Sequence, residues 1–280
     1  MSSGTGTLYV VATPIGNLAD SSPRSIEALR AASVVACEDT RTSRTLLAHH
    51  GLSPKTVALH EHNEREATAK LLETLRAGED VALVSDAGTP GISDPGAHLV
   101  AAAHAEGLRV VPLPGPSAAV AAYSASGFAS MRFLFAGFLP VKGRAAALES
   151  IDAACPVVLY EAPHRVRETV ADLLARFGGG RELVIARELT KKFEEIARLR
   201  LADAPAWLEA GPHRAQGEFV LVLGPGPERT PGRAEAQRVL GLLMEKLPAG
   251  EAAKLAARIT GVPRNELYKA ALAAGDGPGK

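Results

Sequence analysis

Glycine, proline and aspartate gather in two segments, each of which directly follows an apolar run typical of a buried strand. Ser85–Gly96 reads SDAGTPGISDPG, and Pro112–Val120 reads PLPGPSAAV. Glycine and proline favour tightly turned backbone, which presents peptide amides and carbonyls to a small ligand without side chains in the way. The two loops therefore predict a small-molecule site. Ser117 alone is less informative, because a serine here can equally cap the next helix.

Several acidic and imidazole side chains also follow predicted strands, where one of them could act as a general base. A well-placed base accelerates a reaction by about 10²–10⁴-fold. Each has a structural alternative: Asp39 can cap a helix beginning at Thr40, His60 can be a hydrogen-bonded histidine at a strand end, and Glu161 can pair with Arg165. The candidates are Glu38, Asp39, His60, His62, Asp86, Asp94 and Glu161.

Lys191 and Glu188 offer a second acid–base possibility. A lysine held between carboxylates can take or stabilise a proton if burial lowers its pKa. The surrounding TKKFEE segment also fits a solvated surface turn. Both interpretations stay open at this point.

The first 116 residues contain the elements that would position these side chains. Apolar runs alternate with helical patterns, such as the helix over Ser22–Ala32 with Ser22 as its cap and Pro23 at its first position. Strands separated by single helices predict an open parallel sheet, and its ligands bind at the carboxyl ends of the strands. The predicted strands are Thr7–Thr13, Ser33–Glu38, Thr56–Glu61, Asp80–Asp86 and Arg109–Gly115.

Residues 117–225 have a different pattern, with five more strands but only two clear helices, over Lys142–Ala154 and His164–Phe177. This predicts a second α/β domain with a mixed sheet. Residues 226–233 are rich in Gly and Pro and predict a linker. Residues 234–280 predict a helical region of three short helices that resembles a helix-turn-helix. Such a region either contacts nucleic acid or simply packs its own leucines.

Composition excludes several classes. The 280 residues are 46% hydrophobic and 22% charged, enough to form cores, and the apolar runs are too short to cross a membrane, so we expect a cytoplasmic protein. Cys37 and Cys155 lie in no CxxC pair, and we expect buried thiols rather than a metal site. Thr13–Asp20 has one glycine and no GK[ST], which disfavours dinucleotide and P-loop enzymes. The net charge of zero requires any nucleic-acid contact to rely on a local basic patch.

Seven motifs together resemble the ribosomal RNA small-subunit methyltransferase I family of the tetrapyrrole-methylase superfamily. The resemblance covers about Leu8 to Leu223, and the helical tail is also similar. The motifs occur in the same order as in that family: TPIGNL, EDTR, HEHNE, SDAGTPGISDPG, PGPSA, LYEAPHR and ARELTK.

The resemblance implies a class III methyltransferase with two α/β domains, which uses S-adenosylmethionine to methylate a cytidine ribose 2'-hydroxyl in the decoding region of 16S ribosomal RNA. It also implies a homodimer and no metal. The alternative is a methylase of the same fold that acts on a small molecule or a protein. The implied cofactor contacts are Pro14, Gly88, Thr89, Pro90, Gly91, Ile92, Ser117, Ala118, Tyr160 and Gly217.

For catalysis, the candidates retained are Asp39, Glu38, Glu161 and Lys191. Contacts with RNA phosphates need cationic or hydrogen-bonding side chains on exposed elements. Arg41 and Arg44 lie three residues apart on one predicted helix, so they share a face. The candidates for RNA contacts are Arg41, Arg44, His60, His62, Asn63, Lys142, Arg144, His164, Arg165 and Arg167.

Overall fold

The computed structural model describes residues 4–151, 154–226 and 233–275. The chain divides into two compact units, one made of residues 1–151 and 156–224 and the other of 152–155 and 225–280. The first unit contains two five-stranded sheets, and the second is helical. Most of the predicted linker at 226–233 lies outside the described residues.

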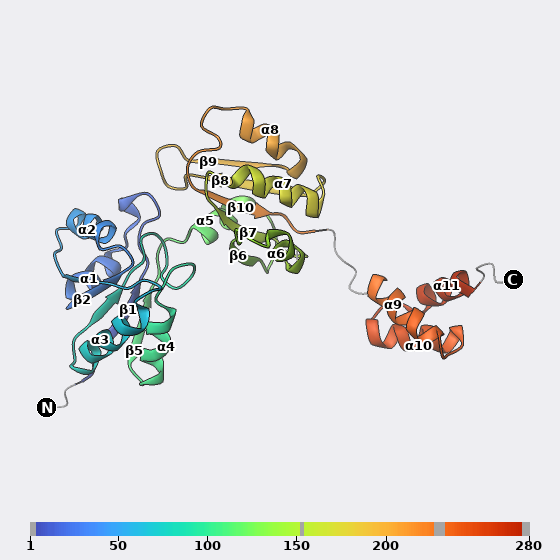
Figure 1. Cartoon of the computed structure of the whole chain (residues 1–280), viewed down its shortest axis with the longest axis horizontal. Coiled ribbons are helices and arrows are strands. Elements are labelled where there is room, and N and C mark those ends of the chain that lie inside the picture. Colours follow the sequence, from blue (N-terminus) through green and yellow to red (C-terminus); the bar gives the residue numbers. More distant parts are fainter. Residues whose placement is uncertain (1–3, 152–153, 227–232, 276–280) are drawn as a thin grey trace. The chain divides into compact units, whose positions relative to one another are not determined.

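The first sheet is entirely parallel, as predicted, with the order β3-β2-β4-β1-β5 (Figure 1). Its strands are short and apolar, which suits a sheet covered on both faces. The glycine- and proline-rich loops follow β4 and β5, at the carboxyl edge. The strands are β1 (Thr7–Val11), β2 (Val34–Cys37), β3 (Lys55–Ala58), β4 (Val81–Leu83) and β5 (Arg109–Leu113).

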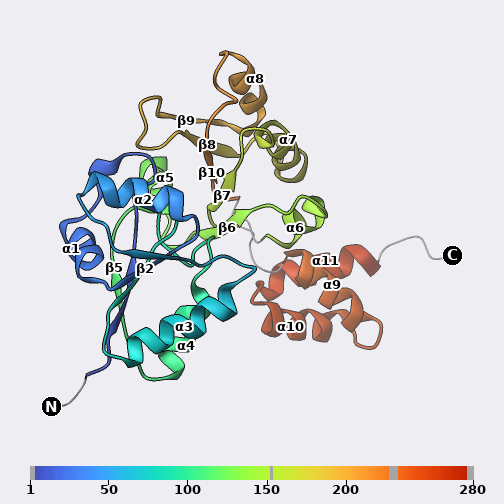
Figure 2. The ribbon, with the colours of Figure 1, turned by 60° about the vertical axis from the view of Figure 1, so that its left-hand side comes forward.

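Two pairs of helices cover this sheet, one pair on each face (Figure 2). Leu71 and Leu99 from α3 and α4 pack against one face, and Leu29 and Leu47 from α1 and α2 pack against the other. The predicted cap of α1 is confirmed, because Ser22 Oγ accepts a hydrogen bond from the Ser25 amide at 3.1 Å. The helices are α1 (Pro23–Ala31), α2 (Thr40–His49), α3 (Glu64–Arg76) and α4 (Ala97–Ala105).

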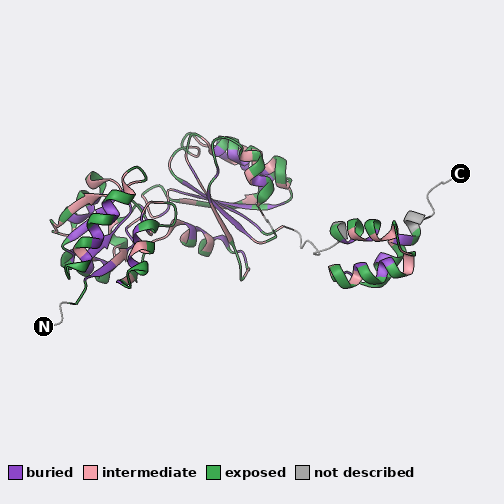
Figure 3. Cartoon of the chain, turned by 60° about the horizontal axis from the view of Figure 1, so that its bottom comes forward, coloured by how far each residue is buried: buried purple, intermediate pink, exposed green. Residues whose placement is uncertain are grey.

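The second sheet is mixed, which confirms the sequence prediction. Its order is β6-β7-β10-β8-β9; β6 and β7 are parallel, and the other neighbours are antiparallel. Strand β10 is buried along its whole length, and β7 is buried except at Tyr160, which is half-buried (Figure 3). The strands are β6 (Leu134–Phe138), β7 (Val157–Glu161), β8 (Glu182–Arg187), β9 (Glu195–Arg200) and β10 (Phe219–Leu223).

The prediction of only two helices in this part was incomplete. The described residues also form α5, rich in alanine, and the six-residue α8. Ala119 and Ala122 of α5 pack against Val158 and Val220 of the sheet. Because nearly all of α5 is apolar or small, it lacks the alternation of faces that marks a surface helix. The helices are α5 (Ala118–Ser126), α6 (Arg144–Ser150), α7 (Val166–Phe177) and α8 (Ala204–Glu209), and short 3₁₀ turns lie at Leu18–Asp20 and Leu201–Asp203.

The helical unit consists of α9 (Arg233–Met244), α10 (Ala249–Thr260) and α11 (Arg264–Gly275), close to the three predicted helices. Its core includes Leu240 and Leu267, so the unit packs its own apolar side chains. No described helix is long and apolar enough to cross a membrane.

The two cysteines differ in burial. Cys37 is fully buried in β2, as expected, whereas Cys155 is only half-buried. The expectation of two buried thiols was therefore wrong for Cys155.

Candidate active site

Two loops at the carboxyl edge of the first sheet are joined by their backbones. The Thr13 amide donates to Gly88 O at 2.8 Å, and the Gly88 amide donates to Thr13 O at 3.0 Å. Thr13 Oγ1 also donates to Ser85 O at 3.1 Å. Gly88 has a φ of 85°, a conformation that side-chain-bearing residues rarely adopt. The loops after β1 and β4 thus form one continuous wall.

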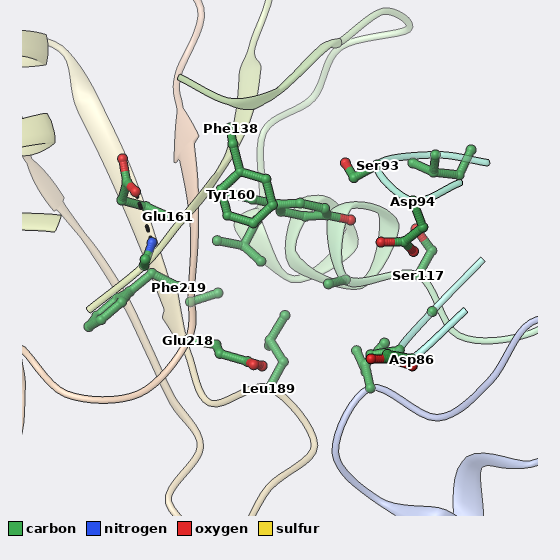
Figure 4. A pocket seen from close by; sticks show the side chains of 18 of the residues that line it. Asp86, Ser93, Asp94, Ser117, Phe138, Tyr160, Glu161, Leu189, Glu218 and Phe219 are labelled. Carbon is green, nitrogen blue, oxygen red and sulfur yellow. Dashed lines mark hydrogen bonds between the residues drawn. The ribbon is translucent and has the colours of Figure 1, made fainter. Parts of the chain in front are cut away.

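A pocket of about 410 Å³ opens beside this wall, within the range of small-ligand sites. Apolar side chains from both sheets line it, including Ile15, Phe138 and Leu189. Figure 4 shows the Tyr160 hydroxyl directed toward the side where Asp94 and Ser117 lie. The pocket therefore combines apolar surfaces with a polar side that contains carboxylates.

The structure brings many of the predicted cofactor residues together. Pro14 lies in the wall of a second pocket of about 290 Å³. Pro90, Gly91 and Gly217 line neither pocket. Gly217 has a φ of 90°, and a Cβ there would lie 2.5 Å from Glu188 Cγ, so this glycine permits close packing. The predicted residues that line the first pocket are Gly88, Thr89, Ile92, Ser117, Ala118 and Tyr160.

Tyr160 connects the second sheet to α5. Its hydroxyl accepts a hydrogen bond from the Ala119 amide at 3.2 Å. Its ring packs edge-on against Phe135 and Phe138, with centroids 5.0 and 5.5 Å away. Burial raises the pKa of Tyr160, so it stays a neutral hydrogen-bonding group. This arrangement fixes the start of α5 at the pocket.

Glu38, Asp86 and Asp94 form a group of carboxylates at the carboxyl edge of β2 and β4. Burial raises the pKa of Glu38, and the charges of Asp94 and Asp86 raise it further. Burial also raises the pKa of Asp94, against a hydrogen bond from Ser85 that lowers it, and Asp86 adds to the increase. In the described part of the chain, none of the three forms an ion pair with lysine or arginine. Like charges held together in this way favour a bound cation or a proton.

Asp39, beside Glu38 in sequence, has a structural role. It caps α2 by accepting from the Arg41 amide at 2.8 Å, and its carboxylate also pairs with Arg41 Nη2 at 2.6 Å. The hydrogen bonds from Arg41 lower the pKa of Asp39 to about 2. A carboxylate with so low a pKa is a weak base.

Glu161 is likewise held by internal contacts. It is only 2% exposed, and it accepts from the Ala162 amide at 2.8 Å and from Thr169 Oγ1 at 2.5 Å. Arg165 Nε lies 3.5 Å from the same carboxylate. Successive strand residues point to opposite faces, so the side chains of Tyr160 and Glu161 diverge. In Figure 4 the Glu161 carboxylate lies far from Asp94 and Ser117.

Lys191 differs from the prediction. Its Nζ lies 2.9 Å from Glu188 Oε1 and 2.9 Å from Glu218 Oε2. Burial acts to lower the pKa of Lys191, but the two carboxylates raise it overall. The condition for acid–base chemistry at Lys191, a pKa lowered by burial, is therefore not met. The charged lysine instead braces a turn in which Glu188 and Thr190 have positive φ values of 51° and 65°, and Leu189 between them lines the pocket.

Four of the five predicted RNA-contacting arginines make internal contacts. Arg144 pairs with Glu168 and Asp172 of α7. Arg165 donates to Leu139 O at 2.7 Å. Arg167 lies 3.4 Å from Glu209, and Arg41 pairs with Asp39 as described.

The HEHNE segment shapes a turn. Asn63 accepts from the His60 amide at 2.9 Å and donates to Ala58 O at 3.0 Å. His60 Nδ1 is buried without a hydrogen-bond partner among the described residues. Glu64, which the sequence analysis did not single out, accepts from the Gly96 amide at 2.9 Å and so fixes the end of the glycine-rich loop. The predicted RNA contacts that are exposed and have no ion pair within the described ranges are Arg44, His62, Lys142 and His164.

No group of three or more His, Cys, Asp or Glu residues in the described part of the chain is arranged to hold a metal ion. The three carboxylates of Glu38, Asp86 and Asp94 are therefore not arranged as a metal site either.

Comparisons with known proteins agree with this architecture. The Tetrapyrrole (Corrin/Porphyrin) Methylases family matches residues 7–205, and an RsmI C-terminal HTH domain matches residues 230–275. Two curated relatives are both called "Ribosomal RNA small subunit methyltransferase I". The one from Pseudomonas aeruginosa is 52% identical over 95% of this chain and 97% of its own length. The one from Escherichia coli is 47% identical over 95% of each chain.

Among solved structures, a uroporphyrin-III-C-methyltransferase from Thermus thermophilus superposes with a TM-score of 0.56 at 23% identity, covering 87% of this chain and 99% of that one. A diphthine synthase superposes with a TM-score of 0.57 at 18% identity, covering 78% and 90%. Likenesses at this level of identity establish the fold.

The two sheets, with a pocket lined by residues from both, define a tetrapyrrole-methylase fold of the class III methyltransferase type. Within that class, the chain belongs to the ribosomal RNA small subunit methyltransferase I family.

Proposed function

We propose that this protein transfers a methyl group from S-adenosylmethionine to the 2'-hydroxyl of a cytidine ribose in the decoding region of 16S ribosomal RNA. The observation that carries the proposal is the match to curated relatives over 95% of the chain. The first pocket, whose lining combines apolar side chains with carboxylates, also supports the proposal. The second candidate is a methylase of the same fold that acts on a small molecule or a protein, and the experiment below separates the two.

The pocket fits this cofactor in size, shape and charge. Its volume of about 410 Å³ is that of a small-ligand site. Gly88 offers bare backbone at one side, and Phe138 and Leu189 offer apolar surface for a purine ring. A solved relative of the fold, 18% identical and with a TM-score of 0.53, is a uroporphyrin-III C-methyltransferase complexed with S-adenyl homocysteine. The cofactor supplies a methyl group that its positive sulfur already activates.

Asp94 and Glu38 have different roles in this proposal. Asp94 lines the pocket, and since it forms no ion pair with any described lysine or arginine, its negative charge would attract a cationic ligand. Glu38 does not line the pocket but interacts with Asp94, which does, and we assign it to the substrate side of the site. Its raised pKa makes it a better base than an ordinary glutamate.

In the reaction, the ribose oxygen forms a bond to the methyl carbon while the sulfur–carbon bond breaks. The carboxylate of Glu38 accepts the hydroxyl proton. The other residues of the pocket wall hold the reactants in line, which is the larger part of catalysis when the donor is already activated.

RNA contacts in this proposal come from exposed side chains that form no ion pair among the described residues. Arg44 of α2 and Lys142 before α6 are exposed, as are His62 and His164. Local cations of this kind bind phosphates without any excess of positive charge over the whole chain. A cytoplasmic location follows from the proposed substrate.

A homodimer is also part of the proposal. Val120 of α5, Met131 and Phe133 are exposed large hydrophobic residues. The ring of Phe133 stacks on that of Tyr123 in α5, with centroids 4.4 Å apart. Exposed apolar groups of this kind mark interaction surfaces. Light scattering should give the mass of two chains, and Met131→Glu should shift it toward one.

The experiment that tests the function is methyl transfer from labelled S-adenosylmethionine to small ribosomal subunits and to naked 16S RNA that lack the modification. We expect label on one cytidine ribose after nuclease mapping. Cofactor binding without label in either RNA would favour the second candidate. Absence of cofactor binding would contradict both.

A further inference from the structure

Residues 90–95, in the second half of the glycine-rich loop, form one side of the first pocket. Ile92, Ser93 and Asp94 line that pocket, and Figure 4 shows Ser93 and Asp94 on the same side of it. In the described part of the chain, no backbone hydrogen bond joins residues 90–95 to another segment. The conformation of this stretch therefore depends on the contacts that hold its two ends.

The beginning of the stretch is held by the wall of the pocket. Thr89 Oγ1 donates to Pro116 O at 3.1 Å, and Gly88 exchanges two backbone hydrogen bonds with Thr13. Both contacts lie within two residues of Pro90. The stretch is thus fixed where it leaves the wall.

The other end of the stretch is held at Gly96. The Gly96 amide donates to Glu64 Oε1 at 2.9 Å, and the His98 amide donates to the same oxygen at 3.3 Å. Gly96 precedes α4 and has no side chain with which to cap that helix. Glu64, the first residue of α3, therefore supplies the cap of α4 from another helix.

The position of Glu64 strengthens this contact. A carboxylate is stabilised near the amino-terminal end of a helix, and Glu64 lies at that end of both α3 and α4. A hydrogen bond to a charged acceptor is about twice as strong as one between neutral groups. No side chain at position 96 could replace Glu64 as the cap, because a Cβ there would lie 2.7 Å from Leu83 Cδ2.

We propose that Glu64 is a positioning residue for the cofactor, whose contact with Gly96 holds residues 92–94 in the conformation that lines the pocket. The inference rests on the proposed function, because it takes this pocket to be the site of S-adenosylmethionine. Glu64 lines neither of the two pockets, so it acts through the loop and does not touch the ligand. Asp94, the carboxylate that attracts the cationic cofactor, lies two residues before Gly96.

Loss of this contact lowers the affinity for the cofactor through the population of the loop. When only a fraction of the molecules has the binding conformation, the apparent Kd is the intrinsic Kd divided by that fraction. A hydrogen bond to a charged group shifts such an equilibrium by about tenfold to 100-fold. Once the cofactor is saturating, the loop is held by the ligand, and the chemical step keeps its rate.

Calorimetry with S-adenosylmethionine on the full chain tests the proposal. Glu64→Ala should raise the Kd about tenfold or more, because neither amide keeps its acceptor. The value of kcat on small subunits at saturating cofactor should stay within about threefold of the wild type, so that the loss appears in KM for the cofactor.

Two conservative variants separate the reach of the side chain from its charge. Glu64→Gln keeps a carbonyl oxygen at the same distance from the backbone, so its Kd should stay within about threefold of the wild type. Glu64→Asp keeps the charge but shortens the side chain by one carbon, so it should raise the Kd about fivefold or more. This pair decides the question even if Glu64→Ala does not fold.

Glu66→Ala is the matched control. It removes another carboxylate from the first turn of α3, but Glu66 pairs with Lys70 at 2.7 Å and does not contact the loop. Its Kd should stay within about twofold of the wild type. Calorimetry also reports the fraction of protein that binds, so a misfolded variant is recognised by a stoichiometry below one.

A Kd within about twofold of the wild type in folded Glu64→Ala would overturn the proposal and leave Glu64 as a helix cap only. Equal losses in Glu64→Ala and Glu66→Ala would also overturn it, because they would place the effect in α3 as a whole. A wild-type protein that binds the cofactor but labels no RNA would overturn the proposed substrate, while the Kd values would still decide the role of Glu64. A wild-type protein that binds no S-adenosylmethionine would overturn both.

Discussion

The charged residues of the two sheets differ in how they are paired. At the carboxyl edge of the first sheet, Glu38, Asp86 and Asp94 lie together without an ion pair to lysine or arginine in the described part of the chain, and their pKa values rise where a shift is resolved. In the second sheet and its helices, Glu161 is held by Thr169 and Arg165, and Lys191 lies between two carboxylates.

This difference indicates that the carboxylates at the first sheet serve the reaction, whereas the charged residues of the second sheet stabilise the structure. Unpaired carboxylates near a pocket are free to meet a cation or a proton, which is typical of functional sites. Satisfied carboxylates hold elements in place, and removing one partner leaves the other buried without compensation. The second sheet thus positions apolar walls such as Tyr160 and Leu189, while the first sheet provides the reactive groups.

The largest expected effect is on stability. Glu161→Ala should lower the free energy of unfolding by about 3–5 kcal/mol, because Arg165 and Thr169 lose a buried partner. Chemical denaturation measures it. As a control, Glu209→Ala breaks only the exposed pair with Arg167 and should cost less than about 1 kcal/mol. A Glu161→Ala protein that is stable but inactive would place Glu161 in the chemistry.

Catalysis should depend on Glu38 and hardly on its neighbour. Glu38→Gln should lower kcat about 100-fold, with the affinity for S-adenosylmethionine unchanged. Its loss should also remove the acidic limb of the pH–rate profile, since wild-type kcat rises as Glu38 deprotonates at its raised pKa. Asp39→Asn keeps a good helix cap and should retain activity within about threefold. Equal losses in both variants would contradict the assignment.

Two arginines of α2, Arg41 and Arg44, should differ in how much they contribute to RNA binding. Arg44→Ala should weaken binding to the small subunit about threefold to tenfold and reduce the slope of log affinity against log salt by about 1, because a free cation is lost. Arg41 already pairs with Asp39, so Arg41→Ala should have the smaller effect. Filter binding over a range of salt concentrations measures both. The reverse order would mean that RNA breaks the Arg41 pair.

The smallest effect is a pH-dependent gain in stability. The pKa of Glu38 is raised in the folded state, so its ionisation favours unfolding. The carboxyl group has no effect where it is neutral in both states, and stability falls as the pH rises through the raised pKa. Glu38→Gln should therefore melt about 1–3 °C higher than the wild type near pH 8, and this gain should shrink toward pH 5. A gain that is independent of pH would point to packing instead.

The sequence predicted the sheets well and the individual side chains less well. Parallel strands, the cap at Ser22 and the mixed second sheet follow from local patterns of apolar residues and turns. Whether a charged side chain is free or engaged depends on residues outside its own strand or turn, such as Thr169, eight positions from Glu161, and Glu218, 27 positions from Lys191. The strand alternation at Tyr160 and Glu161 was the one local signal that could have separated their roles.

Some features left no usable signal in a single sequence. The bounds of helix α5 were not predicted, although Ser117 was recognised as a possible cap of a following helix, because alanine gives α5 no polar face. Glu64 reaches Gly96 across 32 positions of the chain, a pairing that no local pattern predicts.

The close packing at Gly16 limits which segments can be exchanged between enzymes of this fold to make chimaeras. A Cβ at this position would lie 2.4 Å from Cγ of Lys191, which belongs to the turn after β8. The loop after β1 and that turn therefore fit only as a matched pair, although 175 positions separate Gly16 and Lys191 in the chain. A chimaera that takes one of the two segments from a distant methylase should fail to assemble its cofactor pocket, whereas one that takes both should retain it.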